Sequence, residues 1–449
     1  MNASDSNIPF LEIPALSQVR GSLRLPGSKS ITNRAFILAA LASGKTRLHH
    51  LLWSDDTRYM AESLEKLGVS GIRFSDGHTE AEIPGTGGKF PAESASLFVG
   101  NSGTSIRFLT AAASLGCGNF TFTGVDRMKE RPIRDLALAL EQIGAQIEYV
   151  ESPGFPPLVL HANGLKGDVL HIRGNISSQY LTAILLAAPC AQSPLKIVVD
   201  GTLISRPYIS MTLKMMKHFG AHVTNRDFKE FEEFEVKNSG YVSPEDYDIE
   251  GDASSATYAL AAAAISSGSV KLCGLGKTSI QGDIRFAEVL EKMGAQISYG
   301  KDFIECSRGK FPLEPIDMDL SAIPDAAMTV AVLSLFAKGK SSLRGIGSWK
   351  VKETDRIVAM ATELRKTGAK VLATDQSLEI TPPETILPAT FETYRDHRMA
   401  MCLSLVAFGI SKGSHIRILD PRCVEKTYPA YWKDLETLTG EPLSIQGEK

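Results

Sequence analysis

The sequence has no apolar run that could cross a membrane, since no stretch of about 18 apolar residues occurs in its 449 residues. Its six cysteines are dispersed, without a C-x-x-C pair or a nearby histidine at metal-ligand spacing, so we expect reduced thiols and neither disulfides nor a zinc site. The net charge of −3 provides no general attraction to nucleic acid or to an anionic membrane. The start of the chain has neither a cationic segment nor an apolar signal core, and we therefore expect a cytosolic protein.

Motifs for metal and cofactor chemistry are also missing. There is no H-x-x-x-H pair, no dinucleotide fingerprint and no G-x-S-x-G elbow beside a plausible triad, so we expect no metal and no cofactor. Two segments resemble the end of a nucleotide-binding P-loop, at Gly44-Lys45-Thr46 and Gly276-Lys277-Thr278. The required earlier glycine is replaced by Ala39 in the first and by Lys271 in the second, and the first match follows a predicted helix where a P-loop follows a strand. A nucleotide kinase that depends on ATP and Mg²⁺ is therefore an alternative with little support.

An internal repeat determines the predicted architecture. A helical pattern that ends in an apolar residue and a glycine recurs, with the glycines 76, 76, 74, 74 and 72 residues apart. These are Gly68, Gly144, Gly220, Gly294, Gly368 and, in a looser copy, Gly440. Each of the first five stands where a helix needs a left-handed C-terminal cap before a strand. Six units of about 75 residues therefore fill the chain.

A second, alanine-rich helix is predicted once per unit, and it is followed by short β-branched runs that are typical of strands. This β/α alternation indicates an α/β protein made of two similar halves of three units each, which divide near residues 241–250. The chain is also too long for one ordinary core, and two domains of somewhat over two hundred residues fit its length.

The starts of the alanine-rich helices carry residues that suit anion binding. They read Gly27-Ser-Lys-Ser-Ile-Thr-Asn-Arg34, Gly100-Asn-Ser-Gly-Thr-Ser-Ile-Arg107, Gly174-Asn-Ile-Ser-Ser-Gln179, Gly251-Asp-Ala-Ser-Ser255, Pro324-Asp-Ala-Ala327 and Asp396-His-Arg398. Helix N-termini offer unpaired N–H groups to a phosphate, and neighbouring Lys and Arg side chains neutralise it. Helix capping explains each segment taken alone. Their recurrence, together with basic clusters at 127–131, 350–356 and Lys426, favours a pocket for several phosphate groups.

Two carboxylates lie among these cations. Asp325 stands at a helix start, and Glu353 lies between Lys352 and Arg356, so the two acids could take opposite roles in proton transfer. A helix cap for Asp325 and a solvated ion pair for Glu353 explain the pattern equally well. The residues alone therefore indicate a phosphate-handling transferase or lyase, and a non-catalytic phosphate-binding scaffold stays open.

Seven ordered segments between about Leu25 and Pro429 resemble the 5-enolpyruvylshikimate-3-phosphate synthase family. They are Leu25-Pro-Gly-Ser-Lys-Ser-Ile-Thr-Asn-Arg34, Gly100-Asn-Ser-Gly-Thr104, Arg127-Met-Lys-Glu-Arg-Pro132, Ser177-Ser-Gln179, Gly251-Asp-Ala-Ser-Ser255, Val351-Lys-Glu-Thr-Asp-Arg356 and Asp396-His-Arg-Met-Ala400. The resemblance implies two inside-out α/β barrel-like domains, each of three repeated β/α units, with the active site in the cleft between them. It assigns residues 28–247 to the first domain and residues 1–27 with 248–449 to the second.

The reaction implied by the resemblance belongs to the shikimate pathway of aromatic amino acid biosynthesis. A monomer would transfer the enolpyruvyl group of phosphoenolpyruvate to the 5-hydroxyl of shikimate 3-phosphate and release phosphate. Asp325 would take the hydroxyl proton, while Glu353, with Lys29, would protonate the methylene carbon. Shikimate 3-phosphate would be bound by Lys29, Ser30, Arg34, Ser177, Ser178, Gln179, Ser205, Tyr208, Asp325, Ser348 and Lys352. Phosphoenolpyruvate would be bound by Lys29, Gly103, Arg131, Gln179, Arg356, Arg398 and Lys426.

Two positions depart from the pattern that the resemblance implies. Ser348 stands where many relatives have Asn, and Phe108 stands where many have Pro. Because Gly103 is present, the expectation is sensitivity to glyphosate. The nearest alternative is a sister transferase that uses UDP-N-acetylglucosamine as acceptor and typically carries a loop cysteine, whereas residues 125–132 here contain none.

Overall fold

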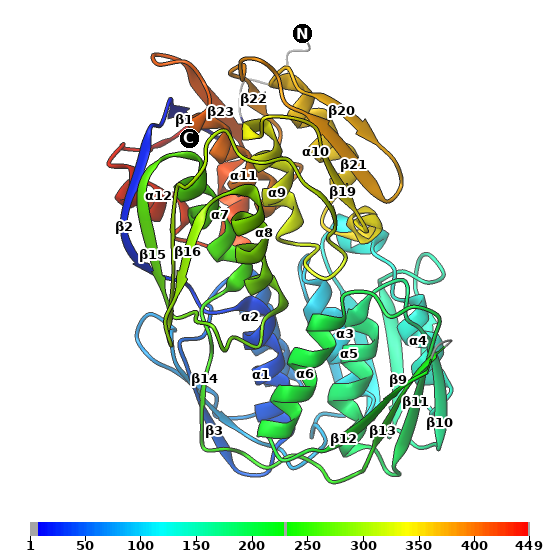
Figure 1. Ribbon diagram of the computed structural model, residues 1–449. Coiled ribbons are helices and arrows are strands. Elements are labelled where there is room, and N and C mark those ends of the chain that lie inside the picture. Colours follow the sequence, from blue (N-terminus) through cyan, green and yellow to red (C-terminus); the bar gives the residue numbers. More distant parts are fainter. Residues whose placement is uncertain (1–7, 229–230, 448–449) are drawn as a thin grey trace. The chain divides into compact units, whose positions relative to one another are not determined.

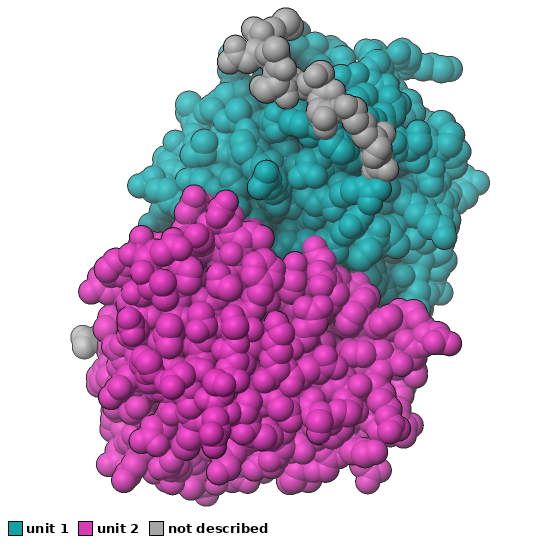
Figure 2. All heavy atoms as spheres, turned by 180° about the vertical axis from the view of Figure 1, so that it is seen from behind, with its two compact units in different colours: residues 1–26, 251–449 teal, residues 27–250 magenta. Residues whose placement is uncertain are grey.

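The computed structural model describes residues 8–228 and 231–447, and the chain forms two compact units. Unit 1 comprises residues 1–26 and 251–449, and unit 2 comprises residues 27–250, as coloured in Figure 2. Unit 2 is therefore an insertion between two segments of unit 1.

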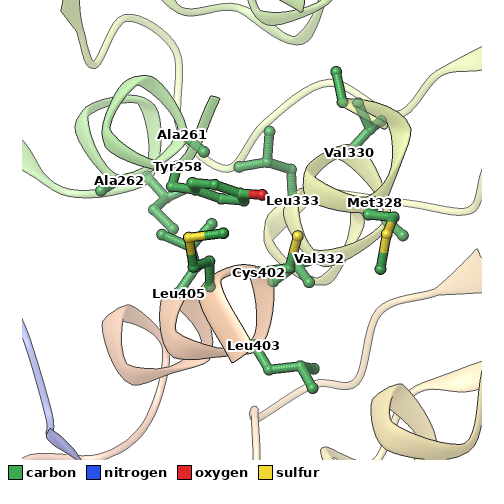
Figure 3. Close-up of a cluster of buried hydrophobic side chains, with 14 of the residues drawn as sticks. Tyr258, Ala261, Ala262, Met328, Val330, Val332, Leu333, Cys402, Leu403 and Leu405 are labelled. Carbon is green, nitrogen blue, oxygen red and sulfur yellow. The ribbon is translucent and has the colours of Figure 1, made fainter. Parts of the chain in front are cut away.

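Each unit is built around three inner helices that are buried on almost all sides. In unit 2 these are α1 (Lys29–Leu41), α3 (Gly103–Ala113) and α5 (Ser178–Ala187). In unit 1 they are α7 (Ala253–Ile265), α9 (Ala327–Leu333) and α11 (His397–Ser404). Small alanine side chains let these helices approach one another closely, so that side chains of α7, α9 and α11 meet in the core of unit 1 (Figure 3).

A second set of helices is amphipathic and lies toward the outside of each unit. These helices are α2 (Asp55–Lys66), α4 (Arg134–Glu141), α6 (Arg206–His218), α8 (Phe286–Met293), α10 (Arg356–Lys366) and α12 (Tyr431–Thr439). Each buries one apolar stripe and exposes the opposite face, as the spacing of its apolar residues requires.

Six four-stranded sheets are found among the described residues, three in each unit. The sheets of unit 2 contain β3 (Lys45–His49), β4 (Arg73–Phe74), β5 (Ala81–Pro84), β6 (Ser94–Phe98), β7 (Cys117–Thr123), β8 (Gln146–Tyr149), β9 (Leu158–Asn163), β10 (Val169–Arg173), β11 (Leu195–Asp200), β12 (Val223–Asp227), β13 (Phe231–Val236) and β14 (Asp246–Asp248). Those of unit 1 contain β1 (Phe10–Pro14), β2 (Gln18–Arg24), β15 (Ser267–Cys273), β16 (Gln296–Tyr299), β17 (Phe303–Ser307), β18 (Asp317–Asp319), β19 (Ser341–Arg344), β20 (Lys370–Ala373), β21 (Ser377–Thr381), β22 (Thr390–Phe391), β23 (His415–Leu419) and β24 (Ile445–Gln446).

All six sheets share one pairing pattern, which is one parallel pair followed by two antiparallel pairs. The orders are β14-β3-β5-β4, β6-β7-β9-β8 and β10-β11-β13-β12 in unit 2, and β2-β15-β17-β16, β18-β19-β21-β20 and β22-β23-β1-β24 in unit 1. Where the parallel pair is continuous in sequence, as in β10-α5-β11, an inner helix connects its strands (Figure 1). The six-fold repeat that the sequence predicts is therefore a repeat of one β/α unit.

The chain exchanges strands where it passes between the units. Strand β2 precedes α1 in sequence but pairs with β15, which follows α7, whereas β14 precedes α7 but pairs with β3, which follows α1. In each unit, one of the three sheets therefore contains a strand that is distant in sequence from its parallel partner. These strands are β2 in unit 1 and β14 in unit 2.

The predicted left-handed glycine caps are confirmed. The φ angles are 94° at Gly68, 105° at Gly144, 83° at Gly220, 104° at Gly294, 90° at Gly368 and 75° at Gly440. With sheets and amphipathic helices around buried inner helices, the predicted inside-out α/β fold is confirmed as well.

Candidate active site

The predicted site residues divide between the two units. Unit 2 holds Lys29, Ser30, Arg34, Gly103, Arg131, Ser177, Ser178, Gln179, Ser205 and Tyr208. Unit 1 holds Asp325, Ser348, Lys352, Glu353, Arg356, Arg398 and Lys426. Most of them stand at or just before the start of a helix, where backbone N–H groups are unpaired.

The start of α1 carries two of these cations. Lys29 is the first residue of the helix, and its Nζ lies 3.1 Å from Oδ2 of the buried Asp56. Arg34 follows on the same helix, and its guanidinium donates to the hydroxyl of Thr212 at 2.8 Å and to the carbonyl oxygen of Ser30 at 2.8 Å. The bond from Arg34 to Thr212 connects α1 to α6. Within α6, the Thr212 hydroxyl donates to the carbonyl oxygen of Tyr208 at 2.8 Å.

Arg34 is buried, but within the described part of the chain its hydrogen bonds reach only hydroxyl and carbonyl oxygens. Burial without a carboxylate partner lowers the pKa of Arg34 to about 10. The ring of Phe108, the residue that departs from the common Pro, lies 5.1 Å from the guanidinium carbon and provides a cation–π contact. The arrangement suits an anion, because a bound phosphate would supply the missing negative charge.

The start of α3 is enclosed by two arginines. A Cβ atom at Gly103 would collide with the guanidinium of Arg131 and would lie 2.9 Å from Nη1 of Arg107. Arg131 is buried and donates to the carbonyl oxygen and side chain of Asn101 at 2.8 and 3.2 Å. Arg107 donates to the side-chain oxygen of Gln179. A side chain at position 103 would therefore have to displace these guanidinium groups, although the φ of Gly103 is not in the left-handed region.

The remaining predicted residues of unit 2 lie at the starts of α5 and α6. The Ser177 hydroxyl accepts from the backbone N–H of Gln179 at 3.3 Å, and the nearby Ser178 is buried. Ser205 precedes α6 with φ 53° and ψ 39°, a left-handed conformation that is costly for a residue with a side chain. Among the described residues, no hydrogen bond joins the side chain of Ser178 or Ser205 to the cations of α1 and α3.

Arg356 is the centre of the charged cluster in unit 1. Its side chain is 1% exposed, and it donates from Nε and Nη2 to Asp396 at 2.7 and 3.2 Å. It also donates from Nη1 to Asp325 and from Nη2 to Glu353, both at 2.9 Å. One guanidinium therefore holds three carboxylates, which is possible because its donors point in fixed, divergent directions.

Asp325 faces two more cations. Its Oδ2 accepts from Arg398 at 3.0 Å, and its Oδ1 lies 3.7 Å from Nζ of Lys352. Burial disfavours the ionised form of Asp325, but Arg398, Lys352 and Arg356 outweigh that effect and hold its pKa well below the usual range. Asp325 is also not the cap of α9, whose N-cap is Ala326, so its carboxylate is available to these cations.

Glu353 lies between two cations. It accepts from Arg356 and, through Oε1, from Nζ of Lys426 at 3.0 Å. Its side chain is 9% exposed, so the alternative of a solvated surface ion pair is wrong. Ser348 is partly buried in a 3₁₀ turn, and its neighbour Trp349 donates from Nε1 to the carbonyl oxygen of Pro324 at 2.7 Å, which fixes the segment before Asp325.

The structure adds acids that the site prediction did not include. Asp56 pairs with Lys29, and Asp396 both holds Arg356 and caps α11 by accepting from the N–H of Arg398. Asp396 stands in a helix-start motif of the sequence, where capping alone already explains an aspartate. Asp283 is buried, accepts from the Ser254 hydroxyl, and has its pKa raised to about 7 by burial and then by the charge of Asp325. Nothing in its sequence context distinguishes it from a surface aspartate.

The P-loop-like segment lies elsewhere. Gly44 stands between the end of α1 and the start of β3, so a helix leads into a strand, which is the reverse of a P-loop. The Lys45 ammonium pairs with Glu82 at 3.0 Å on the surface. Within residues 8–228 and 231–447, no helix is long and apolar enough to cross a membrane, and no group of three metal-ligating side chains is found.

Comparison with solved structures first defines the class of fold. The chain superposes on an enolpyruvyl transferase from Streptomyces tendae, NikO, with a TM-score of 0.77, 16% identity and coverage of 98% of this chain and 99% of that one. It also superposes on the EPSP synthase of Acinetobacter baumannii with a TM-score of 0.79, 25% identity and coverage of 98% and 100%. The fold is therefore that of enolpyruvyl transferases.

Sequence comparison then defines the family. A model of the EPSP synthase (3-phosphoshikimate 1-carboxyvinyltransferase) family matches residues 13–435. A 3-phosphoshikimate 1-carboxyvinyltransferase of Shewanella baltica is 52% identical over 431 residues, which cover 96% of this chain and 99% of that protein. A 3-phosphoshikimate 1-carboxyvinyltransferase of Vibrio cholerae is 50% identical over 430 residues, which cover 96% of this chain and 99% of that protein. The chain belongs to the EPSP synthase family.

Proposed function

We propose that this chain transfers the enolpyruvyl group of phosphoenolpyruvate to the 5-hydroxyl of shikimate 3-phosphate and releases inorganic phosphate. The observation that carries this proposal is its family membership, with relatives of 50–52% identity over almost the whole chain that are named for this reaction. The buried clusters of both units support it, because each surrounds helix starts with cations that suit phosphate and carboxylate groups.

In this proposal each unit contributes residues to the binding of both substrates. Shikimate 3-phosphate is bound by Lys29, Ser30, Arg34, Ser177, Ser178, Gln179, Ser205, Tyr208, Asp325, Ser348 and Lys352. Phosphoenolpyruvate is bound by Lys29, Gly103, Arg131, Gln179, Arg356, Arg398 and Lys426. Ser348 is the least supported member, since its side chain is shorter than the Asn that the resemblance leads one to expect there. Arg34 suits the shikimate phosphate, because its buried charge has no carboxylate partner among the described residues.

The first chemical step is addition across the enol double bond. The 5-hydroxyl oxygen attacks C2 of phosphoenolpyruvate, and Asp325 takes the hydroxyl proton while Glu353, with Lys29, delivers a proton to C3. The new C–O bond and the new methyl group yield a tetrahedral intermediate. Asp325 is suited to accept a proton because its three cation neighbours keep it ionised.

The second step is elimination of phosphate. The bond between C2 and the phosphate oxygen breaks, the methyl group returns a proton to Glu353, and the double bond forms again on the transferred group. The proton that Asp325 took in the first step leaves with the phosphate. The cations around Arg356 stabilise the negative charge that collects on the departing phosphate. Their binding of substrate anions also weakens their hold on Asp325, which raises its proton affinity when the substrates are bound.

Transfer to UDP-N-acetylglucosamine is not favoured, because the relatives that span nearly the whole chain are named for shikimate 3-phosphate chemistry. We propose further that the protein works as a cytosolic monomer. Gel filtration and fractionation of cells that produce it test these two points.

The direct test is phosphate release from the purified protein with phosphoenolpyruvate and shikimate 3-phosphate, run in parallel with UDP-N-acetylglucosamine and with EDTA. We expect release with shikimate 3-phosphate alone, no effect of EDTA, and loss of release in Asp325→Ala. Asp317→Ala is the matched control, since that side chain is 71% exposed in a surface ion pair. Absence of release with shikimate 3-phosphate in the unmodified protein would refute the proposed function.

A further inference from the structure

The turn that leads into α11 has an unusual backbone. Tyr394 and Arg395 both have φ 54°, in the left-handed region that residues with side chains rarely adopt. Two such residues in succession do not hold their conformation without support from their surroundings. The turn therefore depends on contacts made by the rest of unit 1.

The residue after this turn orients two arginines of the candidate site. Asp396 accepts from Arg356 at 2.7 and 3.2 Å, and its Oδ1 also accepts from the backbone N–H of Arg398 at 2.9 Å. A shift of the turn would consequently displace Arg356 and the start of α11 together. Both arginines belong to the set proposed to bind phosphoenolpyruvate.

Glu363 makes hydrogen bonds to the segment that carries this turn. Its side chain is 0% exposed, and its Oε1 accepts from the Tyr394 hydroxyl at 2.8 Å. Its Oε2 accepts from the backbone N–H of Glu392 at 3.1 Å and lies 2.6 Å from Nζ of Lys366. The Lys366 ammonium in turn donates to the carbonyl oxygen of Thr390 at 3.0 Å. The carboxylate thus accepts from three donors, two of which, the Tyr394 hydroxyl and the Glu392 N–H, lie on the segment that carries the turn.

Glu363 and Arg356 belong to the same helix, α10, and are seven residues apart. Seven residues make about two turns and about 10 Å of helix, so the two side chains leave the same face at separate points. Arg356 contacts the turn at Asp396, and Glu363 contacts it at Tyr394 and Glu392. One rigid helix therefore clamps the turn at two places.

We infer that the Glu363 carboxylate, acting through the Tyr394 hydroxyl, is a positioning group for the two phosphoenolpyruvate-binding arginines, Arg356 and Arg398. The inference rests on the proposed function for the identity of the bound substrate. A carboxylate is required because three donors converge on it, whereas a glutamine would present an NH₂ group to an N–H or an ammonium.

The test compares Glu363→Gln and the milder Tyr394→Phe with the unmodified protein. We expect the KM for phosphoenolpyruvate to rise by about tenfold in Glu363→Gln and about threefold in Tyr394→Phe, as loss of buried hydrogen bonds predicts. The KM for shikimate 3-phosphate should stay within about twofold, whereas kcat should fall as well, because Arg356 and Arg398 also hold the proposed base Asp325. Hydrogen exchange of the backbone at residues 393–398 should become faster in both variants.

Matched controls make the same two types of substitution elsewhere in unit 1. Glu379→Gln alters a partly exposed carboxylate paired with Lys340, and Tyr299→Phe removes a hydroxyl that makes no hydrogen bond within residues 8–228 and 231–447. Both controls should leave the KM for phosphoenolpyruvate and the exchange at 393–398 unchanged.

An unchanged KM for phosphoenolpyruvate in Glu363→Gln would overturn the inference, as would an equal rise of KM for both substrates. Absence of turnover in the unmodified protein would instead count against the proposed function. In that case, unchanged hydrogen exchange at residues 393–398 in both variants would still overturn the role of Glu363. Exchange at these residues that is faster in the two variants but not in the two controls would support it.

Discussion

Replacement of Arg356 by lysine keeps the positive charge of the cluster but removes the planar fork of donors. The guanidinium makes four hydrogen bonds to three carboxylates, those of Asp325, Glu353 and Asp396. A lysine ammonium has three donors on one atom at the end of a flexible chain, so it cannot reach three carboxylates in different directions. In Arg356→Lys at least one buried carboxylate therefore loses its partner.

The carboxylate most affected is Asp396, which is 0% exposed and receives two of the four bonds. A hydrogen bond to a charged group contributes about 1.5–3 kcal/mol, and loss of one partner of a buried ion pair costs about 3–5 kcal/mol. We expect unit 1 to be destabilised by about 3–5 kcal/mol. For a unit of this size that corresponds to a decrease of about 1–2 M in the urea midpoint.

A chain with two units need not unfold in one step, so the assay must report on unit 1. Trp349 and Trp432 lie in unit 1, and Trp53→Phe removes the remaining tryptophan, which lies in unit 2. Urea unfolding followed by tryptophan fluorescence in this background measures the change. Arg344→Lys is the control, because the Arg344 pair with Asp317 is exposed and should contribute at most about 1 kcal/mol. A midpoint of Arg356→Lys that equals that of the control would refute the reasoning.

Three further predictions concern other parts of the molecule. Gly103→Ala should raise the KM for phosphoenolpyruvate by about tenfold, because the new methyl group displaces the Arg131 guanidinium, and an unchanged KM would contradict this steric argument. Because Gly103 is present, glyphosate should inhibit turnover, and an inhibition curve without response at millimolar glyphosate would show otherwise. The carboxylates of Asp246 and Glu80 raise the pKa of His49, so its stabilising contribution is present below its unfolded-state pKa and is lost as the pH rises through the folded-state value. The urea midpoint of unit 2 should therefore decrease as the pH rises above about 6.5, the ordinary pKa of histidine, and the decrease should be smaller in His49→Gln.

The repeat made the fold predictable from the sequence. Glycine caps at regular spacing fix where six helices end, and apolar residues spaced three or four positions apart identify the helices that expose one face to solvent. The exchange of β2 and β14 was not predictable in the same way, because their pairing partners lie more than 190 residues away in sequence. Strand propensity is local, whereas this pairing depends on where the chain passes between units.

The candidate site was predictable where a residue type is unusual for its position. Lysine and arginine at the starts of buried helices, such as Lys29 and Arg398, have no role in packing, so they indicate an anion. Asp396 and Asp56 were less accessible to prediction, because aspartate near a helix start is already explained by capping. Glu363 looks like any polar residue of an amphipathic helix until the structure shows that it is fully buried.

The carboxylates that hold the cations also explain how the cluster in unit 1 persists without substrate. Four cations, Lys352, Arg356, Arg398 and Lys426, face three acids, Asp325, Glu353 and Asp396, which leaves one excess positive charge. Without these acids the cations would repel one another in a region with little access to water, and burying them would be unfavourable. Substrate anions then compete with the acids for the same donors. Since Asp325 is the most exposed of the three acids, at 18% against 9% and 0%, it is the carboxylate whose cations substrates reach most easily. The group proposed as the base is thus the one whose proton affinity substrate binding would raise most.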